Sequence, residues 1–277
     1  MRFLNGIGLY AVAFMATLFS GAVAHAEPVE RGLGLQAPVT EVMRDIISFH
    51  NMLLWIISAI VLFVLALLII VMVRFNAKAN PVPSKTTHNT MIEIAWTVIP
   101  VIILVIIAIP SFRLLYKQVV IPEAELTVKA IGYQWYWGYE YPDHPGISII
   151  SNMIEDADLQ PGQPRLLAAD EAMVVPVDTT VRVIVTAADV IHAFAVPPFG
   201  VKIDAIPGRL NETWFRAEKT GMYYGQCSEL CGTRHAFMPI NVKVVTKEEF
   251  EEWTQQQQAA ASNDNVKVAE IAGTELR

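Results

Sequence analysis

Two long stretches without charge dominate the pattern of hydrophobic and polar positions along the chain. Residues 52–73 form a run of 22 residues, and residues 94–112 form a run of 19, without Asp, Glu, Lys or Arg in either. About 20 apolar residues in a helix cross the hydrocarbon core of a bilayer. The pattern therefore predicts a transmembrane helical hairpin within residues 51–116, with helices at about 52–73 and 94–113.

The segment that connects the two runs predicts the orientation of the hairpin. It carries Arg74, Lys78 and Lys85 and no acid. Cytoplasmic loops are enriched in Lys and Arg, so we expect this connection to face the cytoplasm and both ends of the mature chain to lie outside. Pro100 lies inside the second run and suggests a kink there.

The first 26 residues have the pattern of an export signal. Arg2 precedes an apolar run over residues 7–19, and the sequence Ala24-His25-Ala26 is typical of a cleavage site. An uncleaved membrane helix is the alternative, but the run is short for one. We expect a signal peptide at 1–26 and a polar external segment at 27–50.

After residue 117 the pattern changes to short β-rich runs between Gly and Pro clusters. Such spacing predicts a β-sandwich or barrel. The clearest expected strands are residues 126–131, 181–186, 214–217 and 240–245. Helical spacing returns at 247–258, and a polar tail at 254–277 is expected to be a frayed helix or disordered. The fold class is thus an α+β membrane protein, with a helical hairpin followed by an external, cupredoxin-like antiparallel sandwich at 117–253.

Composition supports this division. Of 277 residues, 53% are hydrophobic and only 17% charged, which favours a membrane protein. Between residues 123 and 252 there are 19 Asp or Glu against 10 Lys or Arg. That excess would attract a basic partner, although simple solubility explains it equally well. No motif typical of nucleic-acid binding, phosphate binding or nucleophilic catalysis is present.

The candidate chemistry lies in one loop, residues 225–238. It holds both cysteines of the chain, Cys227 and Cys231, followed by His235 and Met238. Soft ligands of this kind favour copper, and a mononuclear copper site needs two His, one Cys and a weakly bound Met. His192 is the best candidate for the second imidazole. One cysteine is then in surplus, which suggests two thiolate-bridged coppers.

A disulfide between Cys227 and Cys231 is the main alternative, because the compartment is oxidising. The bond would close a very short loop, which limits its stabilising effect. His192 taken alone is better explained as a core histidine. The cysteines, both histidines and the methionine together favour copper.

The loop Gly225-Gln-Cys-Ser-Glu-Leu-Cys-Gly232, with His235 and Met238-Pro239, resembles the copper A loop of the cytochrome c oxidase subunit II family. Residues 134–141 (QWYWGYEY), residues 204–211 (DAIPGRLN) and the two-helix anchor are similar to the same family. The resemblance spans about residues 40–253.

The resemblance implies a dinuclear copper A centre with two copper ions per chain. Its ligands would be His192, Cys227, Glu229, Cys231, His235 and Met238. The two cysteines would bridge the coppers, and Glu229 would contribute its backbone carbonyl. The Glu229 carboxylate would bind magnesium shared with subunit I. The chain has no Cys-x-x-Cys-His motif and is expected to carry no haem of its own.

The resemblance also implies where electrons and protons would pass. Trp135 would be the point where electrons enter from cytochrome c, with the acids Glu140, Asp170 and Asp189 docking that basic protein. Glu93 would lie at the mouth of a proton channel of subunit I. The plainer readings are an aromatic core or interface belt, a solvated acidic surface, and a helix N-terminal acid.

The function implied is that of the electron-intake subunit of cytochrome c oxidase. Electrons would pass from cytochrome c through copper to the haem of subunit I, where oxygen is reduced to water with proton pumping. Expected partners are subunit I, other oxidase subunits, cytochrome c and the lipid bilayer, and no nucleic acid. The expected location is the bacterial inner membrane, with the copper domain in the periplasm.

Three other classes are alternatives. A quinol oxidase subunit II shares the architecture but lacks the copper ligands, and their presence here argues against that class. A membrane-tethered periplasmic copper carrier or sensor would need exchangeable copper and no Trp135 beside the site. A structural domain closed by a disulfide would need no metal.

Overall fold

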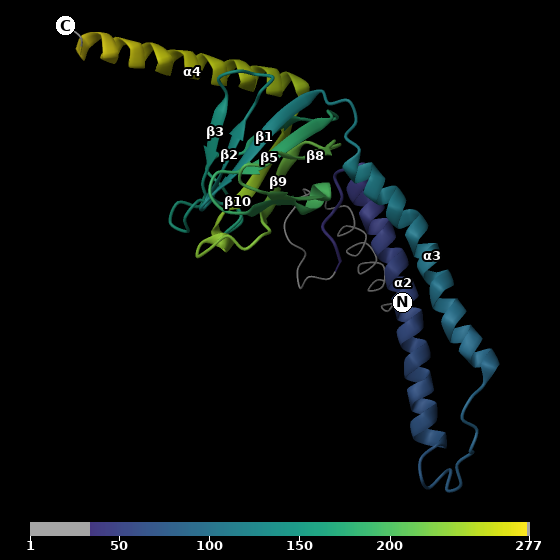
Figure 1. Cartoon of the computed structure of the whole chain (residues 1–277). Helices are drawn as coiled ribbons and strands as arrows, with labels where there is room; N and C mark the ends of the chain where they lie inside the picture. The colour runs from purple at the N-terminus through teal and green to yellow at the C-terminus, as the bar shows by residue number, and fades with distance from the viewer. Residues whose placement is uncertain (1–33, 276–277) are drawn as a thin grey trace, which may run out of the picture.

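The computed structural model describes residues 34–275, with side chains described as far as residue 262. A long helical hairpin, a β-sandwich and a C-terminal helix follow one another along the chain (Figure 1). The expected signal peptide and the start of the mature chain at residue 27 lie outside the described residues.

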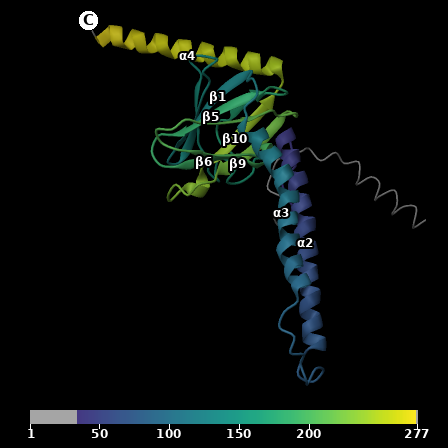
Figure 2. The same cartoon turned by 45° about the vertical axis from the view of Figure 1, so that its right-hand side comes forward.

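The hairpin consists of α2 (Glu41–Arg74) and α3 (Thr90–Val119), which lie side by side and antiparallel (Figures 1 and 2). Both are long and apolar enough to cross a membrane. The 34 residues of α2 extend about 51 Å at 1.5 Å per residue, against a hydrocarbon core of about 30 Å. The turns nearest the sandwich can therefore stand above the hydrocarbon. Helix α3 continues through both Pro100 and Pro110.

Polar contacts fix the outer end of the hairpin to the sandwich. Thr40, the N-cap of α2, donates its hydroxyl to the carbonyl of Phe199 at 2.8 Å. The indole of Trp214 donates to the carbonyl of Lys117 in α3 at 3.1 Å. Because these contacts hold the sandwich at the end of the hairpin, its distance from the membrane depends on how far the two helices extend beyond the hydrocarbon core.

Within residues 34–275, ten strands form two five-stranded sheets, ordered β3-β2-β1-β5-β8 and β4-β10-β9-β6-β7. The strands are β1 (Leu126–Tyr133), β2 (Tyr136–Glu140), β3 (Ser148–Ser151), β4 (Met173–Pro176), β5 (Val181–Ala187), β6 (His192–Val196), β7 (Val201–Ala205), β8 (Asn211–Phe215), β9 (Gly221–Cys227) and β10 (Pro239–Val245). The predicted sandwich is confirmed, and the expected strand at 214–217 begins and ends earlier.

The sheets are mixed, which corrects the expectation of a wholly antiparallel sandwich. Strands β1 and β5 pair in parallel, as do β4 and β10, whereas the other strand pairs are antiparallel. The strands β2, β3 and β4 separate β1 from β5 along the chain, and β4 belongs to the other sheet. A long connection of this kind permits a parallel pair, while a tight hairpin requires an antiparallel one.

The core lies between the sheets. Buried and half-buried positions alternate along β5, whereas every residue of β6 is buried. Trp137, Tyr139 and Tyr141 of the aromatic run are fully or almost fully buried. The plainer reading of that run as an aromatic core therefore holds for these three residues. Trp135 is half-buried at the start of the run.

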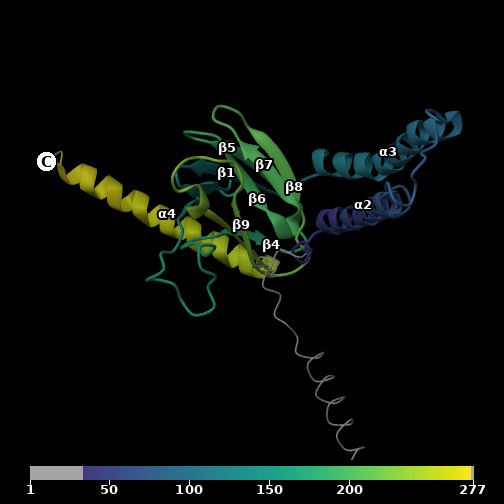
Figure 3. The ribbon, with the colours of Figure 1, turned by 90° about the horizontal axis from the view of Figure 1, so that it is seen from below.

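The C-terminal helix α4 (Lys247–Glu275) continues beyond the expected helix at 247–258, so the tail is helical to residue 275. Its first turns cover the sandwich, where the ring of Trp253 lies 5.1 Å from that of Tyr141 and 5.7 Å from that of Phe250. The remainder extends away from the sandwich (Figure 3).

Candidate metal centre

Three elements bring the predicted ligands to one end of the sandwich, opposite α4 (Figure 1). His192 is the first residue of β6, and Cys227 is the last residue of β9. The two strands pair with Phe194 opposite Cys227, which places the imidazole near that sulfur. The loop between β9 and β10 supplies the other ligands, and His235 begins a short 3₁₀ turn within it.

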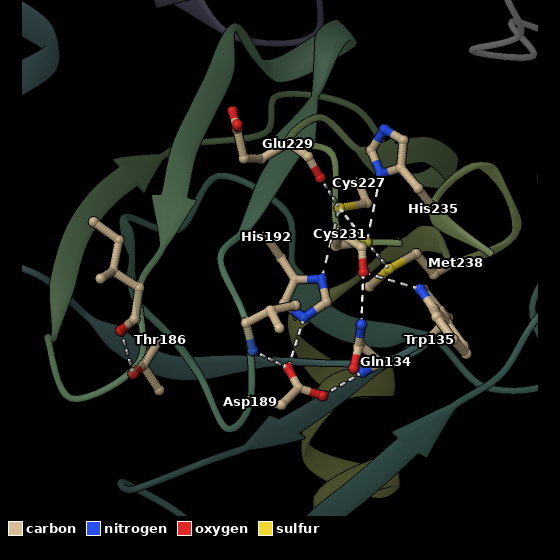
Figure 4. A network of polar contacts seen from close by, with 12 residues as sticks. Gln134, Trp135, Thr186, Asp189, His192, Cys227, Glu229, Cys231, His235 and Met238 are labelled. Atoms are coloured by element: carbon tan, nitrogen blue, oxygen red, sulfur yellow. Dashed lines mark hydrogen bonds and ion pairs between the residues drawn. The ribbon is translucent and has the colours of Figure 1, made fainter. Parts of the chain in front are cut away.

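The sulfur and nitrogen atoms of the five side chains lie in contact (Figure 4). Cys227 Sγ is 3.8 Å from Cys231 Sγ and 3.8 Å from His192 Nδ1. Cys231 Sγ is 3.5 Å from His235 Nδ1 and 3.5 Å from Met238 Sδ. The ligand atoms of His192, Cys227 and Cys231 all lie within 4.8 Å of one another. The structure thus gathers the predicted side-chain ligands.

Glu229 faces the cluster with its backbone. Its carbonyl oxygen is 3.4 Å from Cys227 Sγ. Its carboxylate points away from the sulfurs and is exposed (Figure 4). The carbonyl and the carboxylate are therefore free to bind different ions, as the sequence prediction requires.

The two thiols suit a metal better than a disulfide. A disulfide joins sulfurs at about 2.05 Å, whereas these are 3.8 Å apart and both cysteines are free. Two sulfurs at that separation, each about 2.3 Å from one first-row metal ion, subtend roughly 110° at the ion. That angle is close to tetrahedral. The donor set is soft, and such donors favour copper over calcium or magnesium.

The surroundings of the two thiols differ. Burial acts to raise the pKa of Cys227, but hydrogen bonding with His192 and the backbone of Glu229 outweighs it and lowers the pKa. Burial and the neighbouring Cys227 raise the pKa of Cys231. The metal-free pair is therefore expected to hold one thiolate beside one thiol. A metal bound by both sulfurs must displace the second proton.

Asp189 holds the imidazole of His192. Its carboxylate accepts a hydrogen bond from His192 Nε2 at 2.9 Å and from the backbone N–H of Gln134 at 2.7 Å. Burial acts to raise the pKa of Asp189, but these bonds outweigh it and lower the pKa. With Nε2 occupied, His192 presents Nδ1 to the sulfurs. Sequence analysis gave Asp189 a docking role only; its spacing of three residues before His192 was the available signal.

Glycines make room for this arrangement, and sequence analysis did not single them out. A Cβ at Gly132 would lie 2.8 Å from Cδ2 of His192. Gly232, with a φ of +121°, would bring a Cβ to 3.0 Å from the Trp135 ring. Both positions need the close approach that only glycine permits.

Trp135 lies directly against the loop between β9 and β10. Its indole N–H donates to the carbonyl of Cys231 at 3.2 Å, and the side chain of Gln134 donates to the same oxygen at 2.8 Å. The half-buried indole therefore links the surface to the backbone of a cysteine ligand. Gln134 is a further neighbour of the site that sequence analysis did not single out.

The remaining predicted acids have local partners. Glu140 pairs with Lys129 at 2.9 Å. Asp170 accepts from the backbone N–H of Asn152 at 2.7 Å. Glu93 accepts from the backbone N–H of Asn89, the N-cap of α3, at 3.3 Å. Each contact explains the acid structurally, and the docking and proton-path roles stay predictions.

Comparison with known proteins agrees with both parts of the fold. A family model for the periplasmic domain of cytochrome c oxidase subunit II matches residues 126–245. A second, for the transmembrane domain of the same subunit, matches residues 28–114.

Named relatives extend over nearly the whole chain. A probable cytochrome c oxidase subunit 2 from Rickettsia bellii is 55% identical over 253 residues, covering 91% of this chain and 94% of the relative. Cytochrome c oxidase subunit 2 of Cereibacter sphaeroides is 46% identical, covering 90% and 88%. The crystal structure of the periplasmic domain of subunit II of cytochrome oxidase from Bradyrhizobium japonicum is 60% identical, covering 51% of this chain and 99% of that one, with a TM-score of 0.48. With both domain models and relatives of near-full length in agreement, this chain belongs to the cytochrome c oxidase subunit II family.

Proposed function

We propose that this chain is the electron-intake subunit of a cytochrome c oxidase. It accepts electrons from cytochrome c at a dinuclear copper A centre and passes them to the haem of subunit I, where oxygen is reduced to water with proton pumping. The observation that carries the proposal is the hydrogen bond from Trp135 to the carbonyl of Cys231, which joins the surface to a paired-thiol site.

The ligands suit an ion that is retained. His192 is completely buried, and Cys227, Cys231 and Met238 are each no more than 6% exposed. When bound, the copper pair supplies one-electron redox chemistry shared over two ions. The chain contributes a ligand set fixed by two strands and by the Asp189–His192 hydrogen bond. A site fixed in advance changes little in geometry when its charge changes, which favours fast transfer.

Burial of the ligands also separates this proposal from a copper carrier or sensor. A carrier must release its ion to a partner, and exposed ligands serve that purpose best. Here only His235 among the side-chain ligands is half-buried rather than buried. The indole beside the site has no purpose in a carrier.

The remaining proposed roles concern partners. Glu229 would bind magnesium with its exposed carboxylate at the boundary with subunit I. Glu140 and Asp170 would attract cytochrome c, and Glu93 would stand at a proton channel. The copper domain would lie in the periplasm, with the hairpin in the bacterial inner membrane and the connection that contains Lys78 and Lys85 in the cytoplasm.

Replacement of the indole tests electron intake. Trp135→Phe keeps an aromatic ring but removes the N–H, while Gln134 still holds the carbonyl of Cys231. We expect the variant oxidase to retain its copper and to be reduced by cytochrome c at least tenfold more slowly. Trp214→Phe, which removes an indole hydrogen bond at the hairpin junction, is the matched control. Unchanged reduction in Trp135→Phe would reject the intake role.

A further inference from the structure

A cleft between α2 and α3 lies where the apolar part of the hairpin ends. It has a volume of about 300 Å³ and lies near the end of the hairpin that joins the sandwich. Met52 begins the charge-free run of α2, and Pro110 lies three residues before Arg113, which ends the run of α3. The cleft therefore crosses the boundary between the hydrocarbon and the headgroup layer.

The lining of the cleft changes from apolar to polar across this boundary. Phe49, Met52, Pro110 and Leu114 give it apolar walls, and the polar side chains include Ser48 and Arg113. Arg113 lies one turn of α3 beyond Pro110, and Ser48 lies one turn of α2 beyond Met52. Both polar groups thus lie on the sandwich side of Met52 and Pro110, with Leu114 beside Arg113.

The charges at the cleft leave one cation uncompensated. Lys117, also in the lining, forms ion pairs of 2.6 Å with Glu41 and with Asp45. The guanidinium of Arg113 has no ion pair or hydrogen bond to any side chain or backbone group between residues 34 and 262, and the side chain is exposed. A guanidinium at the headgroup level is well suited to bind a phosphate through two parallel hydrogen bonds.

We propose that this cleft binds a phospholipid of the leaflet on the sandwich side. The guanidinium of Arg113 and the hydroxyl of Ser48 take the phosphate. One acyl chain lies along Met52 and Pro110. In a phospholipid the phosphate lies next to the acyl chains, and in the cleft the cation lies next to the apolar walls in the same order. Such a lipid fills the space between the helices beside the junction that carries the copper domain.

Native mass spectrometry of the full chain in a mild detergent tests the site, with dioleoyl phosphatidylglycerol as the probe. We expect Arg113→Gln to weaken binding of the first lipid about tenfold, the scale of one charge-assisted contact, and Arg113→Lys to restore most of it. Arg74→Gln removes the same charge at the end of the hairpin far from the cleft and should leave binding of the lipid unchanged. Equal losses in the two glutamine variants would show diffuse attraction and overturn the proposal.

Two further arms keep the outcome clear. Leu114→Trp fills the cleft and keeps Arg113, so it should also lose the lipid, and it decides the question if Arg113→Gln does not fold. Glycerol phosphate, which has no acyl chains, should not compete. In the assembled oxidase, the wild type should retain a lipid that Arg113→Gln loses. If the assembled wild type retains no such lipid, the cleft is covered by another subunit and the proposal fails.

Discussion

At the scale of single residues, the partners of a side chain decide its role. Asp189 has the charge expected of a docking acid, but its carboxylate is bonded to His192 and to the backbone of Gln134. The cluster of five side chains that the structure gathers could be predicted from the sequence, because four of the five lie in one short loop. Gly132 could not be assigned to the site, because its contact with His192 depends on how β1 and β6 meet in space. Asp189 had the local signal of its spacing, but its hydrogen bond with His192 depends on the conformation of the turn between β5 and β6.

Substitution of Asp189 separates the two roles. In Asp189→Asn the amide can still accept from His192, but the charge that favours the present ring orientation is lost. We expect a 10- to 100-fold weaker copper affinity, the usual effect of mutating a hydrogen-bond partner of a ligand. Copper titration of the purified chain measures it. Glu140→Gln, which removes a surface charge away from the ligands, should bind copper normally. A rise in KM for cytochrome c with unchanged copper affinity would instead support docking.

Gly132 tests the space around the same imidazole. A Cβ 2.8 Å from Cδ2 of His192 must displace the ring, because real contacts of a Cβ are longer. Gly132→Ala should therefore fold but perturb the copper absorption spectrum and lower the copper content. Gly162→Ala is the control for an added methyl group that meets no neighbour, because no atom lies within 4 Å of a Cβ there. Its φ of +89° makes this substitution strain the backbone, but the copper spectrum should stay native. A native copper spectrum in Gly132→Ala would contradict the described packing.

At the scale of elements, the sequence pattern predicted the helices and strands that are long or have a regular alternation. The two charge-free runs gave both membrane helices, and β-branched runs gave β1, β5, β8 and β10. The strands β2, β3, β4, β6 and β7 have five residues or fewer, too short to show a period, and β8, also of five residues, was predicted only over its last two. In β6 every residue is buried, so no alternation could reveal it. The length of α4 was underestimated because its distal sequence is polar.

The first turns of α4 should contribute to the stability of the sandwich. Phe250 is 7% exposed and packs against the ring of Trp253, which in turn contacts Tyr141. Phe250→Ala should lower the free energy of unfolding by about 3 kcal/mol, the lower end for a large-to-small core change. Thermal unfolding of the chain measures the effect. Gln255→Ala, at an exposed position of the same helix, should change it by under about 0.5 kcal/mol.

The stability of the junction between hairpin and sandwich should depend on pH through the carboxylate of Glu218. Its carboxylate forms two hydrogen bonds with Arg44 of α2, which lower the pKa of Glu218. A depressed folded-state pKa gives stability that is present above the unfolded-state pKa and is lost as the pH falls through the folded value. Glu218→Gln should therefore lower Tm slightly at neutral pH, and the difference from wild type should vanish in acid. A difference that persists at low pH would exclude this pair as its source.

At the scale of the whole molecule, the two-helix anchor and the sandwich that follows it could be predicted from composition and pattern. The mixed sheets did not, because a parallel pair such as β1 with β5 depends on connections that cross between sheets. The relation between the parts also came only from structure: the junction at Thr40 and Trp214 fixes the copper end relative to the hairpin.

The most direct test of the proposed two-copper centre is the copper content of the oxidised, copper-loaded full chain, in which the pair is one electron short of two Cu(I) ions, combined with its electron paramagnetic resonance spectrum. We predict two tightly bound copper ions per chain, with one unpaired electron spread over two copper nuclei, and loss of that shared signal in Cys231→Ser. One copper per chain with the signal of a single nucleus, or no copper with Cys227 and Cys231 joined in a disulfide, would contradict it.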